Sequence, residues 1–284
     1  MLLIWYPLSL FASNTELLIV DVQWLKQHKE DQDLAIVDVR SREQYLKGHI
    51  PNAVNIPVSS TFNPKTKRDR VANSFYIQSL FSQAGINNND TVVLYDSGNH
   101  IDGGRVFWVF EVFGHKNVKL LNGGFPSWVD NSSNATEIGF TQVAKSNYIP
   151  RLEPERLTTK LGIQLAIGDD DRIIIDARSQ DEYNGKQSIA SRMGHIPSAI
   201  NIPWNDNFTN GEKYNKLKSK EELLKVYGSI DPNKKIYLYC NKGKQSSLSY
   251  MVMRQLGFDA AHYDGSWYEW GNDELLPIEQ KQTK

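Results

Sequence analysis

An internal repeat constrains the fold of this chain more than any other feature of its sequence. Residues 36–57 read IVDVRSREQYLKGHIPNAVNIP, and residues 174–203 read IIDARSQDEYNGKQSIASRMGHIPSAINIP. Both segments pass from an apolar run into Asp-x-Arg-Ser and end in Gly-His-Ile-Pro-x-Ala-x-Asn-Ile-Pro. The second segment carries an insert between Tyr183 and Gly194. Similarity at so long a period indicates duplicated structural units.

Further matches follow in the same order along the chain. TVVLYDSG at residues 91–98 corresponds to KIYLYCNKG at residues 235–243, and LLNGGFPSW at residues 120–128 corresponds to HYDGSWYEW at residues 262–270. Matched blocks in a conserved order indicate that a whole domain was duplicated.

The repeat predicts how the chain divides. A unit of about 130 residues is close to the usual size of a domain. The stretch between the copies is polar and contains Asn-Ser-Ser-Asn, which is typical of a linker. We therefore predict a first domain over residues 15–130, a linker over residues 131–150 and a second domain over residues 151–280.

The spacing of apolar residues predicts an α/β fold in each copy. Short runs rich in Val, Ile and Leu, such as 34–37 and 236–239, alternate with helical patterns such as 247–257. Strands that alternate with helices form a mainly parallel sheet flanked by helices. With 40% hydrophobic residues, the chain can build a core in each domain.

Charge and cysteine content argue against several classes of function. The 32 basic and 33 acidic residues give a net charge of -1, without the basic block of a nucleic-acid surface or a membrane anchor. One cysteine cannot form an internal disulfide, and no Cys-x-x-Cys or His-Glu-x-x-His pattern offers a metal site. We expect no metal, and partners that are small molecules or other proteins.

The apolar start of the chain bears on its compartment. Residues 1–11, MLLIWYPLSLF, lack the basic beginning of an export signal and are too short to span a bilayer. We interpret residues 1–14 as an extension of a cytoplasmic protein. The alternative is a short export signal, which would place the protein in the periplasm.

The two copies differ at the end of one predicted strand. After Tyr-Leu-Tyr the second copy has Cys240, whereas after Val-Leu-Tyr the first has Asp96. Sites in open α/β sheets form at the carboxyl ends of strands. The following run leads into a predicted helix, so its backbone N–H groups, with Lys242 and Lys244, favour an anion and a lowered thiol pKa. We interpret Cys240 as a nucleophile; the alternative is a cysteine that only packs in the core.

Together the repeat, the Gly-His-Ile-Pro segments, the YDGSWYEW block and the cysteine loop resemble the tandem-domain rhodaneses, the thiosulfate and 3-mercaptopyruvate sulfurtransferases. The resemblance runs from about Val20 to Glu279. It implies two tandem rhodanese-like domains, of which the first, with Asp96 at the cysteine position, is inert. It also implies a ping-pong reaction through a Cys240 persulfide, discharged on cyanide or on a thiol such as glutathione, thioredoxin or a sulfur-carrier protein. The resemblance implies no cofactor besides the covalent persulfide. It also implies a monomer, since most members of the family are monomers.

The resemblance also assigns the loop after the cysteine to substrate binding. Its backbone N–H groups would stabilise the persulfide as an oxyanion hole does. The residues concerned are Asn241, Lys242, Gly243, Lys244, Gln245 and Ser246. Phosphatases on a similar domain close a longer loop with an arginine, in a Cys-x5-Arg pattern. Here Ser246 stands at that position, so the phosphate clamp of such an enzyme is missing.

The loop composition favours thiosulfate as the sulfur donor. Thiosulfate-type members commonly show Cys-Arg-Lys-Gly-Val-Thr and mercaptopyruvate-type members Cys-Gly-Ser-Gly-Val-Thr, whereas this chain has Cys-Asn-Lys-Gly-Lys-Gln. Lys242 and Gly243 match the thiosulfate pattern, and Lys244 adds a second charge suited to a dianion. Asn241 fits neither pattern.

The insert of the second copy bears on the same choice. Mercaptopyruvate enzymes usually bring arginines from the second Asp-x-Arg segment and its insert to hold a carboxylate, but Glu182 stands at one such position, and the insert offers Lys186 and Arg192 at other spacings. We therefore predict a thiosulfate sulfurtransferase with Arg192 as a candidate substrate contact, and 3-mercaptopyruvate as the alternative donor. A regulatory module that binds a partner or an anion without catalysis is a further alternative.

Several conspicuous residues recur in the inert copy, which favours a structural role. Asp176 and Arg178 are expected to pair and brace the fold, and His195 to bond to the backbone in a turn. Trp267 and Tyr268 are candidates for the wall of a pocket. Trp270 has a counterpart in the first copy and is predicted to be structural.

Overall fold

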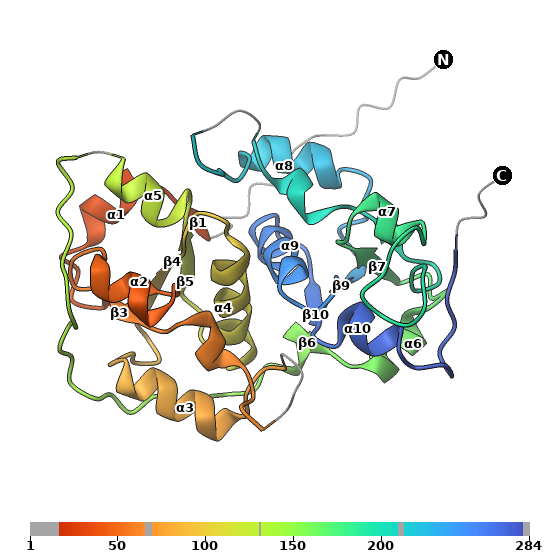
Figure 1. Ribbon diagram of the computed structural model, residues 1–284, viewed down its shortest axis with the longest axis horizontal. Coiled ribbons are helices and arrows are strands. Elements are labelled where there is room, and N and C mark those ends of the chain that lie inside the picture. Colours follow the sequence, from red (N-terminus) through yellow and green to blue (C-terminus); the bar gives the residue numbers. More distant parts are fainter. Residues whose placement is uncertain (1–16, 66–69, 131, 210–212, 281–284) are drawn as a thin grey trace, which may run out of the picture.

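The computed structural model describes residues 17–65, 70–130, 132–209 and 213–280 of the chain. They form two α/β units that lie side by side (Figure 1). Residues 1–14, for which an extension or an export signal is predicted, lie outside these ranges. Within them, no helix has the length and apolar character needed to cross a membrane.

Each unit is built on one parallel sheet, as the alternation of strands and helices predicts. The described strands are β1 (Ile19–Val20), β2 (Leu34–Asp38), β3 (Val54–Asn55), β4 (Thr91–Tyr95), β5 (Val118–Leu121), β6 (Leu157–Thr158), β7 (Arg172–Asp176), β8 (Ile200–Asn201), β9 (Lys235–Tyr239) and β10 (Ala260–Tyr263). The strand order is β1-β5-β4-β2-β3 in the first sheet and β6-β10-β9-β7-β8 in the second. The two orders are identical, so the repeat in the sequence is a repeat of topology.

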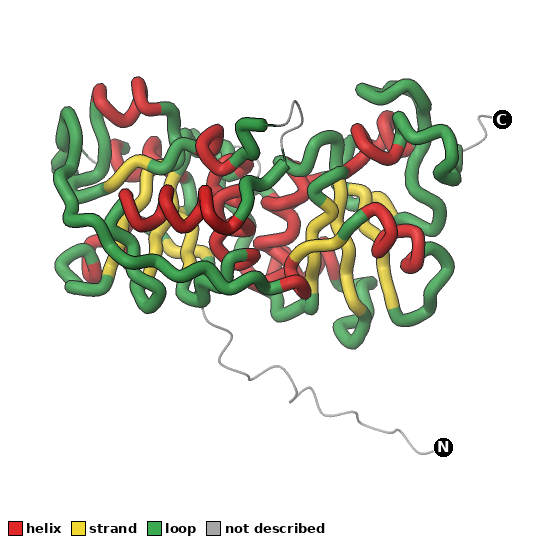
Figure 2. Tube along the Cα trace, turned by 90° about the horizontal axis from the view of Figure 1, so that it is seen from below, coloured by secondary structure: helices red, strands yellow, loops and turns green. Residues whose placement is uncertain are grey.

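Helices enclose the strands of each unit (Figure 2). Helices α2, α7 and α8 each begin with a capping box. In it the serine side chain accepts from a backbone N–H of the first turn, and a Gln or Glu side chain accepts from the backbone N–H of the serine. The helices are α1 (Val22–His28), α2 (Arg42–Lys47), α3 (Ser74–Gln83), α4 (Ile101–Val112), α5 (Gly124–Val129), α6 (Lys160–Ala166), α7 (Gln180–Tyr183), α8 (Lys220–Tyr227), α9 (Gln245–Gln255) and α10 (Ser266–Trp270), with 3-10 turns at Val58–Thr61, Pro154–Arg156 and Trp204–Asn207. The helix predicted over 247–257 is α9.

The repeated Asp-x-Arg motif forms the same buried ion pair in both units. Arg40 Nη2 lies 2.6 Å from Asp38 Oδ2, and Arg178 Nη2 lies 2.6 Å from Asp176 Oδ2. Each guanidinium also donates to a glycine carbonyl of the following Gly-His-Ile-Pro turn, which ties the strand end to that turn. His195 contacts a backbone carbonyl through Nδ1 at 2.8 Å. The predicted structural roles of these residues are confirmed.

The polar segment between the two repeats is folded along the first unit. Tyr148 is fully buried, and its ring meets Phe81 edge-on with the ring centroids 5.0 Å apart. Ser146 N donates to Ser82 O at 3.0 Å. This connection therefore contributes to the surface and to the core of the first unit, which its polar composition does not indicate.

Helices α4 and α9 pack against each other where the two units meet (Figure 1). Gly104 allows the close approach, because a Cβ there would lie 2.7 Å from Leu248 Cα. At the other end of the pair, Arg254 Nε lies 3.3 Å from Glu111 Oε2, and Tyr250 donates to the same carboxylate. One hydrophobic cluster contains buried residues of both units. A shared apolar core holds the two units in one arrangement.

Candidate active site

Cys240 lies directly after β9, at the carboxyl edge of the second sheet and close to the start of α9. The residue is 1% exposed, which fits both a nucleophile and a packing cysteine. The backbone N–H of Gly243 points at the sulfur, with N and Sγ 3.2 Å apart. Gly243 has a φ of +80°, and a Cβ there would lie 3.0 Å from Asp264 O. Glycine therefore allows the turn that aims this N–H group at the sulfur.

The carbonyl groups at the start of the loop are bonded to α10. Trp267 N donates to Cys240 O, and Tyr268 N donates to Asn241 O, both at 2.9 Å. Because these oxygens are held at α10, the loop can present N–H groups to an anion beside the sulfur.

The side chain of Asn241, which fits neither donor pattern, is bonded to helix α7. Its Nδ2 donates to Glu182 Oε1 at 2.6 Å, while Glu182 Oε2 accepts from Ser179 N at the start of α7. The residue next to the cysteine is therefore fixed by a charge-assisted hydrogen bond to the carboxylate that stands where an arginine was expected in mercaptopyruvate enzymes.

The two lysines of the loop have different surroundings. Lys242 is exposed, and its Nζ lies 5.2 Å from the centroid of the Tyr268 ring. Lys244 Nζ lies 2.6 Å from Asp102 Oδ1, in α4 of the first unit. Since a carboxylate already neutralises the charge of Lys244, Lys242 is the stronger attractor for an anionic donor.

Gln245 begins α9, and Ser246 follows it with a fully buried side chain. The Ser246 hydroxyl lies 2.8 Å from His262 Nε2. Burial lowers the pKa of His262 to about 3, although the charge of Asp264 opposes this shift. The imidazole is therefore neutral at pH 7, and it supports the start of α9 as a hydrogen-bonding group without charge.

A buried arginine of the first unit reaches this loop, which the sequence reading missed. Arg105 Nη1 lies 3.2 Å from Gly243 O and 2.5 Å from Asp264 Oδ1. Burial alone would raise the pKa of Asp264, but the charge and hydrogen bond of Arg105 outweigh it, so the pKa is lowered. The available signal was a single arginine within the apolar helix pattern of GGRVFWVF. Such a residue is buried only when it is paired.

Arg192, a candidate substrate contact, is engaged elsewhere. Its guanidinium donates to the carbonyls of Gly271 at 3.2 Å, Leu276 at 2.8 Å and Trp270 at 3.0 Å, and also to that of Asp273. These bonds occupy most of the donors of an arginine side chain. The Arg192 side chain thus fastens the insert to the end of α10 and the segment that follows it.

The aromatic residues of α10 divide into packing residues and one exposed ring. Trp267 is buried, with the guanidinium carbon of Arg178 4.4 Å from its ring centroid. Trp270 is buried and donates from Nε1 to Pro277 O at 2.8 Å, which confirms its structural role. Tyr268 is 39% exposed beside Lys242 and is the α10 ring that remains available to a ligand.

The corresponding position of the first unit is filled by a carboxylate. Asp96 Oδ1 accepts from Gly98 N at 2.8 Å, and Asp96 Oδ2 accepts from Gly103 N at 3.1 Å. The Asp96 side chain is 1% exposed. The first copy therefore uses its backbone donors on its own side chain.

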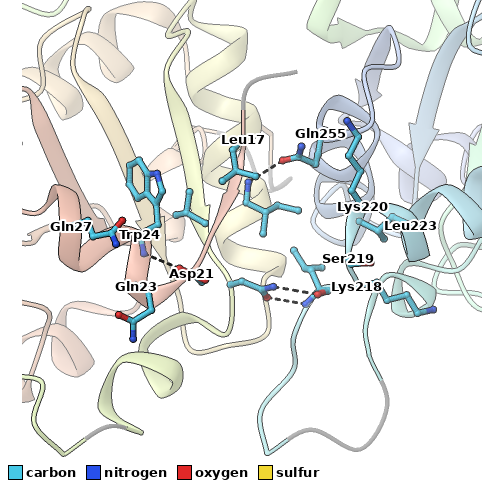
Figure 3. Close-up of a pocket in the computed structure, with 14 residues that line it drawn as sticks. Leu17, Asp21, Gln23, Trp24, Gln27, Lys218, Ser219, Lys220, Leu223 and Gln255 are labelled. Atoms are coloured by element: carbon cyan, nitrogen blue, oxygen red, sulfur yellow. Dashed lines mark hydrogen bonds between the residues drawn. The ribbon is translucent and has the colours of Figure 1, made fainter. Parts of the chain in front are cut away.

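A separate cavity of about 660 Å³ lies between β1 and α1 of the first unit and α8 of the second (Figure 3). Leu17, Trp24, Leu223 and Gln255 line it, together with polar residues of both units. Its lining contains neither Cys240 nor the loop residues that follow. The cavity is therefore distinct from the candidate site.

Fold and site together define a duplicated α/β protein in which one copy presents a cysteine-headed loop at the junction of the units. The family model for the rhodanese-like domain matches residues 21–131 and again residues 163–273. The chain belongs to the rhodanese family of sulfurtransferases.

Relatives of known name cover nearly the whole chain. A provisionally named thiosulfate sulfurtransferase of Saccharopolyspora erythraea is 32% identical over 95% of this chain and 99% of its own length. The provisionally named thiosulfate sulfurtransferase SseA of Mycobacterium tuberculosis is 34% identical over 95% of this chain and 93% of its own. The crystal structure of the 3-mercaptopyruvate sulfotransferase SseA from Escherichia coli matches with a TM-score of 0.78 and 24% identity, over 89% of this chain and 99% of that one. The last match supports the fold.

Proposed function

We propose that this protein moves the outer sulfur of thiosulfate to a thiophilic acceptor through a persulfide on Cys240. The observation that carries the proposal is the Gly243 N–H aimed at Cys240 Sγ at 3.2 Å. A backbone donor at this place stabilises the thiolate before the reaction and the negative sulfur after it.

The reaction needs no external oxidant or reductant. The Cys240 thiolate attacks the outer sulfur of thiosulfate, a new S–S bond forms, and sulfite leaves with the electron pair of the old S–S bond. Cyanide or a thiolate then attacks the outer sulfur of the persulfide, and the Cys240 thiolate leaves. The first acceptor gives thiocyanate and the second a new persulfide, and the enzyme returns to its starting state.

The surroundings of the sulfur bear on how the donor reaches it. Because Cys240 is 1% exposed, the donor reaches the sulfur only when neighbouring groups move aside. Lys242 is the exposed cation of the loop and attracts a dianion. The same burial excludes water from the persulfide and limits its loss in side reactions.

Two features favour thiosulfate over 3-mercaptopyruvate as the donor. The named relatives that align with almost the whole chain are provisionally thiosulfate enzymes. In addition, Glu182, which is bonded to Asn241 of the loop, stands where mercaptopyruvate enzymes are expected to have an arginine, so the site lacks that partner for the carboxylate of a keto acid. The alternative donor is 3-mercaptopyruvate, the substrate in the name of the Escherichia coli structure.

Intact mass spectrometry tests the proposal directly. Thiosulfate should add the mass of one sulfur atom to the wild-type chain, cyanide should remove it, and Cys240→Ser should show no addition. A comparison of kcat/KM for thiosulfate and 3-mercaptopyruvate then ranks the donors. If neither donor loads Cys240, the protein is not a sulfurtransferase of this kind, and a binding module becomes the better description.

A further inference from the structure

Arg105 is the residue through which the first unit touches the backbone of the cysteine loop. It lies in α4, is fully buried, and bonds through Nη1 to Gly243 O and Asp264 Oδ1. These partners belong to the second unit, 138 and 159 positions further along the chain. Burying a guanidinium is costly unless its hydrogen bonds are made, so this contact stabilises one specific arrangement of α4 and the loop.

The acidic partner of Arg105 accepts a second hydrogen bond from the first unit. Asp264 Oδ2 accepts from Val71 N of the first unit at 2.9 Å. Beside it, a Cβ on Gly243 would meet Asp264 O and Asp264 Oδ1 at 3.0 Å. Gly243 therefore lies between Arg105 and Asp264, without room for a side chain.

The two polar groups of Gly243 have separate tasks. Its N–H donates to Cys240 Sγ, and its carbonyl accepts from Arg105. The N–H and the carbonyl flank one Cα, so the bond to Arg105 anchors one side of the residue whose other side faces the sulfur, at a φ of +80° that glycine allows. The contact with Arg105 thus bears on the geometry at the nucleophile.

The repeat supplies an internal comparison for this contact. Arg105 follows Asp96 at the same spacing as Ser249 follows Cys240, and α4 and α9 begin at the same distance from these two residues, so Arg105 corresponds to Ser249 in the second unit. Ser249 bonds to Asn207 of its own unit at 3.4 Å. The arginine is therefore a feature of the unit that lacks the nucleophile, and it serves the loop of the other unit.

We propose that Arg105 is a positioning residue for the reaction at Cys240: by holding the Gly243 carbonyl it keeps the Gly243 N–H on the sulfur. The proposal rests on the sulfurtransferase function proposed above. It gives the inert unit a direct part in the chemistry, in addition to its part in folding.

The test compares Arg105→Met and Arg105→Lys with Arg254→Met. Arg254 also joins the two units, through Glu111, but it lies at the far end of the helix pair and is the matched control. Two readouts are measured for each variant. One is the rate of single-turnover sulfur loading from thiosulfate, and the other is the pH midpoint for alkylation of Cys240 by iodoacetamide. Urea unfolding reports any general loss of stability.

The alkylation midpoint also depends on the other charged or titratable groups around the loop. These are Lys242, Lys244, Glu182, Asp102, Asp264, His262, Arg70 and Glu269. Arg105→Met also removes the charge beside Asp264, whereas Arg105→Lys keeps it, so a midpoint of Arg105→Lys that still lies above that of Arg254→Met reports the lost contact with Gly243.

We expect Arg105→Met to slow sulfur loading about tenfold or more, because one misplaced donor at a developing anion costs that much. Its alkylation midpoint should move to higher pH. Arg105→Lys, which keeps one charged nitrogen, should recover part of both effects, and Arg254→Met should match the wild type. If Arg105→Met does not fold, an intermediate midpoint and rate in Arg105→Lys still support the proposal.

Equal behaviour of the Arg105 and Arg254 variants, or wild-type values in Arg105→Lys when Arg105→Met does not fold, would overturn the positioning role. Failure of the wild type to take up sulfur would overturn the proposed function instead. In that case the alkylation midpoints still decide whether Arg105 aims the Gly243 donor at Cys240.

Discussion

The loops after β4 and β9 stand at the same place in two copies of one fold, but they hold different atoms. Asp96 uses two backbone donors, from Gly98 and Gly103, for its own carboxylate. Cys240 receives one donor, from Gly243, on its sulfur. In both units the fold therefore provides backbone donors at this edge of the sheet. The side chain at the strand end decides whether they serve structure or chemistry.

A second difference lies opposite the same two residues. A Cβ on Gly124 of the first unit would lie 2.6 Å from Asp96 O, so that unit has no room for a side chain there. In the second unit Ser266 stands at the corresponding place, and its hydroxyl accepts from Cys240 N at 3.2 Å while donating to Tyr263 O. In the first loop the carboxylate of Asp96 takes up the backbone donors, whereas in the second the Ser266 hydroxyl bonds to the backbone and the Cys240 sulfur receives the Gly243 N–H.

The largest expected effect is the loss of sulfur loading when the cysteine that distinguishes the second loop from the first is replaced. Cys240→Ser should abolish sulfur loading from thiosulfate, because the serine hydroxyl stays protonated at neutral pH, is a far weaker nucleophile than a thiolate and has no sulfur with which to form a persulfide. Urea unfolding should show nearly wild-type stability, since oxygen replaces sulfur with little change in shape. Residual loading in the variant would show that another residue carries the sulfur.

Asp96→Ala should produce the opposite pattern. Loss of the carboxylate leaves the N–H groups of Gly98 and Gly103 buried without acceptors, which costs about 1–3 kcal/mol of unfolding free energy. Sulfur loading of Cys240 should remain at the wild-type rate. Urea unfolding and single-turnover loading measure the two quantities, and a loss of loading in a folded variant would contradict the division of labour between the loops.

The pH dependence of stability should differ when a residue of the first unit is copied into the second. His262 has a pKa of about 3 in the folded protein against 6.5 when unperturbed, so between these values the unfolded chain binds a proton that the folded chain does not. Stability is therefore lost as the pH falls, by about 1.4 kcal/mol per pH unit for this group.

Leu120 stands at the place of His262 in the first unit, which makes His262→Leu the matching substitution. Urea unfolding between about pH 6 and 4 should show a slope shallower by one proton in this variant. Other histidines are unchanged, so the difference isolates His262. Parallel profiles for the two proteins would mean that the imidazole does not stay neutral in the folded state.

The smallest expected effects concern the two loop lysines. Lys242→Ala should raise KM for thiosulfate by up to about tenfold, because it removes an exposed cation near the donor. Lys244→Ala should raise it only about twofold, because Asp102 already neutralises that charge. Steady-state kinetics at low salt measure both. A larger effect of Lys244→Ala would show that the ion pair with Asp102 opens when the donor binds.

Much of the fold could be predicted from the sequence. The strands at 34–37 and 236–239 and the helix at 247–257 follow from apolar spacing, and the buried Asp-Arg pairs follow from their recurrence in both copies. The polar composition of the linker did not reveal that Tyr148 packs into the first unit. Composition describes the average polarity of a segment and does not show the burial of a single aromatic side chain within it.

The site was predicted in part. Cys240, Gly243 and the start of α9 are neighbours in the chain, so a local pattern reveals them. The partners of the loop side chains are distant in sequence, and spacing alone gave no contact for Asn241 or Lys244. A contact of Arg192 with substrate stays a prediction, but its guanidinium donates to backbone carbonyls, which the sequence of the insert did not indicate.

By itself the sequence determined that the protein is a duplicated α/β chain and that one copy bears the cysteine loop. Repetition and periodicity are local properties of the chain, and they survive without knowledge of contacts. Only the tertiary structure decided which charges remain available at the loop and that Arg105 of the first unit bonds to Gly243. Such pairings arise when α4 and α9 pack together, and burial then selects partners that lie more than a hundred positions apart.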